Sequence, residues 1–152
     1  MTWWFPICYN YTDLLITIGV IIVGIQIITD NCCDLPPELL ERYKVIVVPL
    51  RVRFGDEEIP PENFDNATFY NRLKTSPQLP STSQPMPGDF LVQYQKAIEQ
   101  NQQIISIHLS SGISGTVQSA NIAAEMLTGE PIHIIDSRKA SVGQGLMVLE
   151  AA

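Results

Sequence analysis

Four short, mostly aliphatic runs dominate the pattern of hydrophobic and polar positions along the chain. They are rich in the β-branched side chains that strands favour. Their hydrophobicity is continuous rather than alternating, which indicates strands that are covered on both faces. The pattern therefore predicts an α/β fold, with a mainly parallel sheet flanked by helices. The predicted strands are Ile25–Ile28, Val45–Val48, Ile104–Leu109 and Ile132–Ile135.

The segments between these runs carry apolar residues at helical spacing. Helices are predicted over residues 36–43, 66–74, 88–100 and about 115–127, and a further one begins near residue 141.

Two other segments between the runs are not helical. Arg51–Phe54 alternates, which predicts a half-exposed, peripheral strand that Gly55 and Asp56 turn, with Glu57 and Glu58 in the same solvated turn. Thr75–Pro87 holds four prolines and five Ser or Thr residues, which is typical of a loop that is either functional or mobile.

The first 25 residues form an apolar extension that stands apart from this pattern. The uncharged run between Asp13 and Asp30 has 16 residues, fewer than the roughly 20 that a membrane-spanning helix needs. No Lys or Arg precedes Arg42, whereas a secretory signal begins with basic residues. Residues 1–25 are interpreted as a non-structural extension, with a membrane-associating tail and a secretion signal as the alternatives, so membrane contact is expected to be transient at most.

The globular domain is predicted to span residues 26–152. Its last helical pattern runs to Ala152 without a capping or breaking residue, which predicts a domain truncated at its C-terminal end.

Composition narrows the classes of partner. Nine Lys and Arg against 16 Asp and Glu give a net charge of −7, which disfavours nucleic acid. Three cysteines, with Cys32 and Cys33 adjacent, do not make a disulfide framework and favour a reducing, cytoplasmic location. The two histidines, His108 and His133, lie inside apolar runs and are interpreted as ordinary strand residues. No metal site is therefore expected.

Small polar residues follow three of the four predicted strands, at residues 29–31, 110–116 and 136–141. Ligands of open α/β sheets bind beyond the carboxyl ends of the strands, so these residues are expected to converge on one edge. Ser114 precedes a predicted helix, whose N–H groups together with hydroxyls can hold a carboxylate or a phosphate. The alternative is that Ser114 only caps that helix.

The loop Ser81–Pro87 offers a second group of hydroxyls. Pro85 and Pro87 favour an extended, low-entropy shape that would present Thr82 and Ser83. The alternative is that both hydroxyls make local turn hydrogen bonds.

A serine hydrolase that uses Ser114 or Ser111 is a weaker hypothesis. Gly112–Thr116 has threonine where the nucleophile motif G-x-S-x-G needs its last glycine, and no loop histidine is available as a base. Phosphate-binding and dinucleotide-binding glycine motifs are also absent from the sequence.

Five of these segments follow one another as they do in one protein family. The chain resembles the DegV family over residues 26–152, through segments 27–36, 47–50, 82–85, 109–120 and 135–137. The resemblance implies a bacterial fatty-acid-binding protein. Some members are the lipid-carrying subunit of fatty acid kinase, which presents the bound acyl carboxylate to a separate ATP-using subunit.

The resemblance also implies roles for individual residues. The family holds the carboxylate with a threonine and a serine that match Thr82 and Ser114, and Ser83, Ser111 and Gly115 would support them. The implied ligand is a long-chain fatty acid such as palmitate, the implied partner is the ATP-binding kinase subunit, and the chain itself is expected to be no enzyme and to need no cofactor.

The chain departs from the family pattern at three points. Asn31 and Met86 stand where serine is usual. The arginine and histidine that complete the family's head-group site belong to a second domain, which is expected to be absent here. A non-functional truncated fragment is therefore the alternative to a fatty-acid-binding protein.

Overall fold

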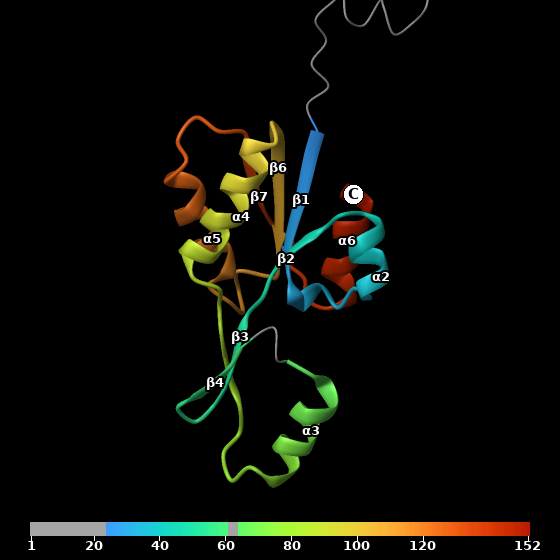
Figure 1. Ribbon diagram of the computed structural model, residues 1–152, viewed down its shortest axis with the longest axis vertical. Helices are drawn as coiled ribbons and strands as arrows, with labels where there is room; N and C mark the ends of the chain where they lie inside the picture. Colours follow the sequence, from blue (N-terminus) through green and yellow to red (C-terminus); the bar gives the residue numbers. More distant parts are fainter. Residues whose placement is uncertain (1–23, 61–63) are drawn as a thin grey trace, which may run out of the picture.

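The computed structural model describes residues 24–60 and 64–152, and its larger sheet has four strands (Figure 1). The strands lie in the order β2-β1-β6-β7, and every neighbouring pair is parallel. Their bounds are β1 Gly24–Asp30, β2 Ile46–Val48, β6 Gln102–His108 and β7 Ile132–Asp136. The predicted parallel sheet is thus confirmed, with strand ends that differ from the prediction by at most two residues.

Helices cover both faces of this sheet, as Figure 1 shows. On one face, α4 (Pro87–Glu99) and α5 (Thr116–Glu125) bury a core that includes Ile28 and Phe90. On the other face, α2 (Pro37–Arg42) and α6 (Val142–Ala151) bury Ile27 and Val148. Adjacent residues of β1 thus enter different cores, which explains its continuous hydrophobicity.

A second, smaller sheet packs below the first and is antiparallel (Figure 1). It contains β3 (Arg51–Phe54), β4 (Glu57–Ile59) and β5 (Ser81–Ser83) in the order β4-β3-β5. Helix α3 (Asn66–Thr75) covers it through Phe69, whose ring centroid is 5.7 Å from that of Phe54. The predicted peripheral strand at 51–54 is therefore the centre of a sheet of its own.

One prediction about this region is wrong and another is incomplete. Glu57 and Glu58 belong to β4 rather than to a solvated turn, because backbone pairing with β3 orders them. Arg72 pairs with Glu57 and Arg51 pairs with Glu58. The loop predicted at residues 75–87 contains β5, which has no apolar side chain and forms by backbone pairing with β3.

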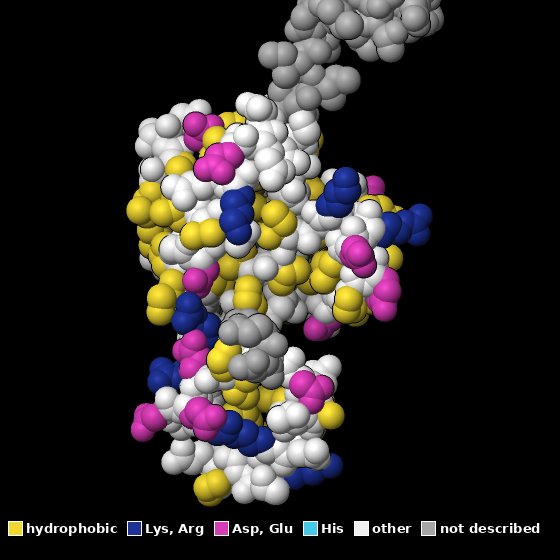
Figure 2. Space-filling view, in the orientation of Figure 1, with side chains coloured by type: hydrophobic (Ala, Val, Ile, Leu, Met, Phe, Trp, Pro, Cys, Tyr) yellow, Lys and Arg dark blue, Asp and Glu magenta, His cyan; other side chains and the backbone are white. Residues whose placement is uncertain are grey.

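The expectations for the N-terminal extension fall almost wholly on residues 1–23, which lie outside the described residues. Gly24 and Ile25 already belong to β1. No helix within residues 24–60 and 64–152 is both long and apolar enough to cross a membrane. Among the described residues on the face in Figure 2, Lys and Arg are interspersed with Asp and Glu and form no continuous basic patch.

Candidate ligand-binding site

A cavity of about 600 Å³ lies beyond the carboxyl ends of β1 and β6, where the two sheets meet. The large sheet contributes strand-end residues, and the small sheet contributes residues of β3 and β5. The predicted convergence of polar strand ends on one edge is confirmed for the ends of β1 and β6 and for Ser141. The lining residues are Asn31, Cys32, Asp34, Leu50, Val52, Thr82, Ser83, Gln84, Leu109, Ile113, Ser114, Gly115, Ala140 and Ser141.

Thr82 reaches this cavity because β5 pairs with β3. In the antiparallel register Thr82 lies opposite Val52, and directly opposed residues project on the same face. Both residues line the cavity. Gln84, two residues after Thr82, lies next to the start of α5: a Cβ atom added at Gly115, the N-cap of that helix, would be 2.9 Å from Gln84 Nε2. The segments that carry Thr82 and Ser114 therefore approach each other closely, and a side chain at Gly115 would require the Gln84 amide to move.

Ser114 does not occupy the helix-capping position that the sequence suggested. Helix α5 begins at Thr116, and Gly115 is its N-cap. Ser114 Oγ nevertheless accepts the Thr116 N–H at 3.3 Å and lies 2.9 Å from Thr116 Oγ1. When the buried Thr116 hydroxyl donates a hydrogen bond to Ser114 Oγ, the Ser114 hydroxyl can donate its own proton to a group in the cavity.

Ser111 does not line this cavity. Its hydroxyl donates to Asp136 Oδ2 at 2.6 Å, and its N–H donates to Asp136 Oδ1 at 3.2 Å. The Ser111 hydroxyl and then the Arg138 N–H lower the pKa of Asp136 from its ordinary value of 3.8. Ser111 thus ties the loop that carries Ser114 to the end of β7.

This contact predicts a pH dependence of stability. A carboxyl whose folded pKa is lowered stabilises the fold above its unfolded pKa and loses that contribution as the pH falls through the folded pKa. We expect Asp136→Asn to be less stable than the parent at pH 6, with the gap narrowing as the pH falls below 3.8, the ordinary pKa of an aspartate. Urea unfolding of both proteins between pH 6 and pH 2.5 measures this gap. A gap that stays constant over this range would contradict the role of the charged carboxylate.

A buried polar network lies directly beneath the cavity, and sequence reasoning missed it. Tyr94 donates to Ser106 Oγ at 2.9 Å, Ser106 Oγ lies 2.7 Å from His108 Nε2, and His108 Nδ1 lies 3.0 Å from Asp30 Oδ2. Burial raises the pKa of Tyr94 to about 12. The available signal was a polar residue at the end of each of two apolar runs, Asp30 and His108, which the pairing of β1 with β6 brings together.

The hydrogen bonds join Ser106 to His108 and His108 to Asp30, as in the catalytic triad of a serine hydrolase. All three residues are fully buried, so a substrate in the cavity cannot reach Ser106. Ser114 and Ser111, the nucleophiles of the hydrolase hypothesis, hydrogen-bond to Thr116 and Asp136. The geometry does not support hydrolysis.

Cys32 also lines the cavity, and its surroundings make its thiol unreactive. Burial, followed by the charges of Asp30 and Asp34, raises the pKa of Cys32 to about 11. The Cys32 thiol therefore stays protonated at neutral pH and is a poor nucleophile. Within the described ranges no group of three or more His, Cys, Asp or Glu residues could hold a metal ion.

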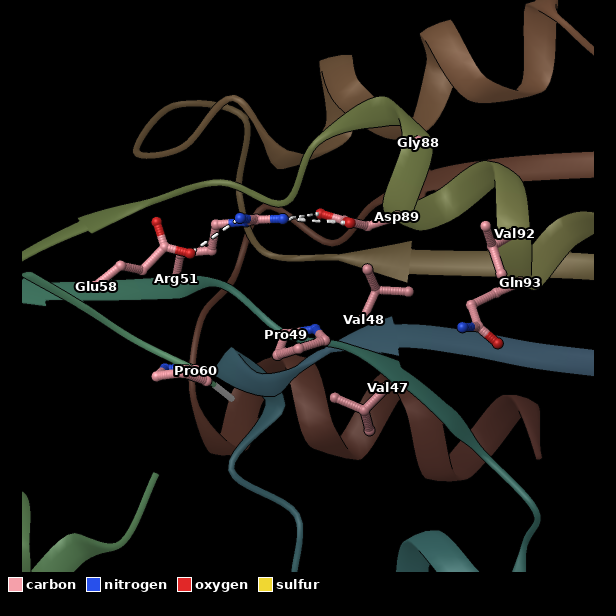
Figure 3. A pocket seen from close by; sticks show the side chains of 10 residues that line it. All are labelled: Val47, Val48, Pro49, Arg51, Glu58, Pro60, Gly88, Asp89, Val92 and Gln93. Atoms are coloured by element: carbon pink, nitrogen blue, oxygen red, sulfur yellow. Dashed lines mark hydrogen bonds and ion pairs between the residues drawn. The ribbon is translucent and has the colours of Figure 1, made fainter. Parts of the chain in front are cut away.

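Arg51 connects the small sheet to helix α4, beside a second cavity of about 420 Å³ (Figure 3). Its guanidinium lies between two carboxylates, 2.9 Å from Glu58 Oε1 and 3.2 Å from Asp89 Oδ2. Asp89, in the first turn of α4, also accepts the Met86 N–H at 2.8 Å. Neighbouring residues of a strand face opposite sides. Arg51 and its two ion pairs therefore lie on the opposite side of β3 from Val52, which lines the ligand cavity.

The family model for DegV proteins, described as uncharacterised, matches residues 24–152. The chain belongs to the DegV family. It is 40% identical over 129 residues to a DegV domain-containing protein of Clostridium perfringens, covering 84% of this chain and 46% of the relative. It is 36% identical over 131 residues to protein DegV of Bacillus subtilis, covering 86% and 47%. The chain thus spans about half the length of these curated relatives.

Solved structures of DegV proteins share the fold. A Thermus thermophilus DegV family protein described as binding fatty acid has a TM-score of 0.77 and 37% identity, over 85% of this chain and 46% of that one. The Bacillus subtilis DegV structure, described as a fatty acid binding protein, has a TM-score of 0.75 and 34% identity, over 85% and 46%. A stearic acid-binding protein of Eubacterium ventriosum has a TM-score of 0.76 and 28% identity, over 81% and 44%.

Two of the three departures expected from the family resemblance fall on described residues, Asn31 and Met86. Asn31 lines the ligand cavity, and its side-chain oxygen accepts the Leu50 N–H at 3.0 Å, which fixes the chain between β2 and β3. Met86 is exposed and directly precedes α4.

Proposed function

We propose that this chain binds a long-chain fatty acid such as palmitate, with the carboxylate between Thr82 and Ser114. The observation that carries the proposal is the shared cavity, which is lined by Thr82 from β5 of the small sheet and by Ser114 from the loop that follows β6 of the large sheet. Hydroxyl donors and the N-terminal end of α5 favour an anion. The solved DegV structures that are described as binding fatty acids support the same ligand class.

The rest of the lining suits the first methylene groups of an acyl chain. Leu50, Val52, Leu109 and Ile113 supply apolar surface around the hydroxyls. No Lys or Arg is among the lining residues that the structure describes, so hydrogen bonds rather than an ion pair would hold the carboxylate. Ser83 and Gly115 would support the site from its two loops, and Ser111 would support it through Asp136.

The proposal extends to the role of the bound lipid. The chain would present the acyl carboxylate to a separate ATP-binding kinase subunit in the bacterial cytoplasm, and that subunit would catalyse acyl phosphate formation. The chain itself would be a carrier and no enzyme. Palmitate-loaded chain, mixed with such a subunit and ATP, should yield acyl phosphate that hydroxylamine traps.

Removal of either hydroxyl tests the head-group site. Thr82→Val keeps the side-chain shape and Ser114→Ala removes only an oxygen, and each is expected to weaken palmitate binding about tenfold, since a hydrogen bond to a charged group contributes roughly 1.5–3 kcal/mol. Ser81→Ala is the matched control, because Ser81 neighbours Thr82 on β5 and is also exposed, yet does not line the cavity. Calorimetric titration of the delipidated chain measures the affinities.

Two results would contradict the proposal in different ways. Wild-type affinity in both variants would place the carboxylate elsewhere. A folded wild-type chain that binds no palmitate, and that carries no fatty acid in native mass spectrometry, would favour the alternative of a non-functional fragment.

A further inference from the structure

Asp30 has four hydrogen-bond partners, and all four are donors. Its Oδ1 accepts the Cys32 N–H at 3.0 Å and Gln144 Nε2 at 3.1 Å. Its Oδ2 accepts the Leu109 N–H at 3.0 Å and faces His108 Nδ1 at 3.0 Å. The residue is completely buried, so these four donors replace the water that a carboxylate would otherwise bind.

The partners of Asp30 belong to the loops that line the ligand cavity. Cys32 and Leu109 are lining residues, and they follow β1 and β6 respectively. Gln144 lies three positions after the lining residue Ser141, whose N–H donates to the Cys32 carbonyl at 2.8 Å. One buried carboxylate thus connects three cavity-lining segments without lining the cavity itself.

The Tyr94 chain sets the direction of the His108 bond. With Tyr94 donating to Ser106, and Ser106 donating to His108 Nε2, the imidazole proton lies on Nδ1 and is donated to Asp30. In this arrangement the hydroxyl protons of Tyr94 and Ser106 and the imidazole proton of His108 each have an acceptor. Phe90 packs against the imidazole edge-on, with ring centroids 5.0 Å apart.

We propose that Asp30 is a positioning residue for the fatty-acid site, fixing the loops after β1 and β6 and the start of α6 relative to one another. The inference rests on the proposed function. Ligand affinity then depends on Asp30, although this residue does not line the ligand cavity. The reason is that the loop that carries Ser114 begins at Leu109, whose N–H donates to the Asp30 carboxylate.

Asp30→Asn is the sharpest test, because the shape is conserved and only the acceptor pattern changes. The asparagine NH2 must face one pair of donors, either Cys32 with Gln144 or Leu109 with His108. We expect palmitate affinity of the full chain to fall at least about tenfold. Amide hydrogen exchange at Cys32 or Leu109 should accelerate by a similar factor, and the His108 Nδ1–H proton resonance should move.

Ile104→Val is the control for a general loss of stability. Ile104 is fully buried in the core between β6 and the helices α4 and α5, away from the cavity. We expect its palmitate affinity to stay within about twofold of wild type and its Cys32 and Leu109 amides to stay protected. Gln144→Met is a milder second variant that removes one of the four donors while retaining the side-chain length, and it should weaken binding about threefold.

The outcomes separate this inference from the proposed function. Wild-type affinity in Asp30→Asn overturns the inference and leaves the fatty-acid site intact. If Asp30→Asn does not fold, Gln144→Met decides, and wild-type affinity in that variant overturns the inference. A wild-type chain that binds no palmitate overturns the proposed function, and the amide exchange rates alone then decide whether Asp30 anchors the loops.

Discussion

Replacing Gly145 with alanine is expected to lower the free energy of unfolding by about 2–3 kcal/mol. A Cβ atom at this position would lie 2.5 Å from the Cys33 carbonyl oxygen and 2.9 Å from Leu35 Cδ2. The first of these atoms is backbone and cannot rotate away, so α6 would have to move off the segment after β1. That movement would also disturb Gln144, which precedes Gly145 and hydrogen-bonds to Asp30.

Gly143→Ala is the matched control on the same helix. Its added Cβ would meet only the Lys139 side chain, at 3.4 Å or more. Alanine is favoured over glycine inside a helix by about 1 kcal/mol, so this variant is expected to be as stable as wild type or more stable. Urea unfolding of both variants, followed by circular dichroism, measures the difference. Equal stability of the two would contradict the close packing of α6 against Cys33.

Replacing Phe90 with alanine is expected to cost about 3–5 kcal/mol of unfolding free energy. Phe90 is fully buried in the core that α4 and α5 form with the large sheet. Its ring lies 5.9 Å from that of Tyr94 and 5.0 Å from the His108 imidazole, centroid to centroid. The substitution therefore opens a cavity and removes the ring that packs against the imidazole of His108.

Leu79→Ala controls for the loss of apolar side-chain atoms. Leu79 is 86% exposed, and truncation of such a surface residue changes stability by no more than about 0.5 kcal/mol. Thermal and urea unfolding of both variants tests the contrast. A cost below about 1 kcal/mol for Phe90→Ala would mean that this core is not packed as described.

The strands of the large sheet were predictable because the residues of each segment reflect its burial. A strand covered on both faces needs apolar residues at successive positions, as at Ile27 and Ile28, which enter opposite cores. The small sheet was only partly predictable. Ser81–Ser83 has no apolar residue, and Glu57 and Glu58 are charged, so β5 and two of the three residues of β4 arise from backbone pairing with β3 that no local pattern encodes.

The candidate site was also only partly predictable from the sequence. Thr82 and Ser114 stood out as hydroxyls in loops next to predicted elements, and the family resemblance selected the same pair. Their shared cavity follows from the packing of two sheets. Ser111 lies in the same loop as Ser114, yet its hydroxyl is bonded to Asp136, and sequence proximity alone could not distinguish the two serines.

The amino-acid pattern was enough to predict the α/β class, the four parallel strands, the helices between them and the segments that carry the candidate hydroxyls. These features depend on interactions between near neighbours and on the burial of each segment. The polar network around Asp30 depends instead on the packing of distant segments, since its partners Leu109 and Gln144 lie 79 and 114 positions away. A buried carboxylate is stable only where folding brings enough donors to it, and that condition depends on strand pairing and helix packing rather than on local sequence.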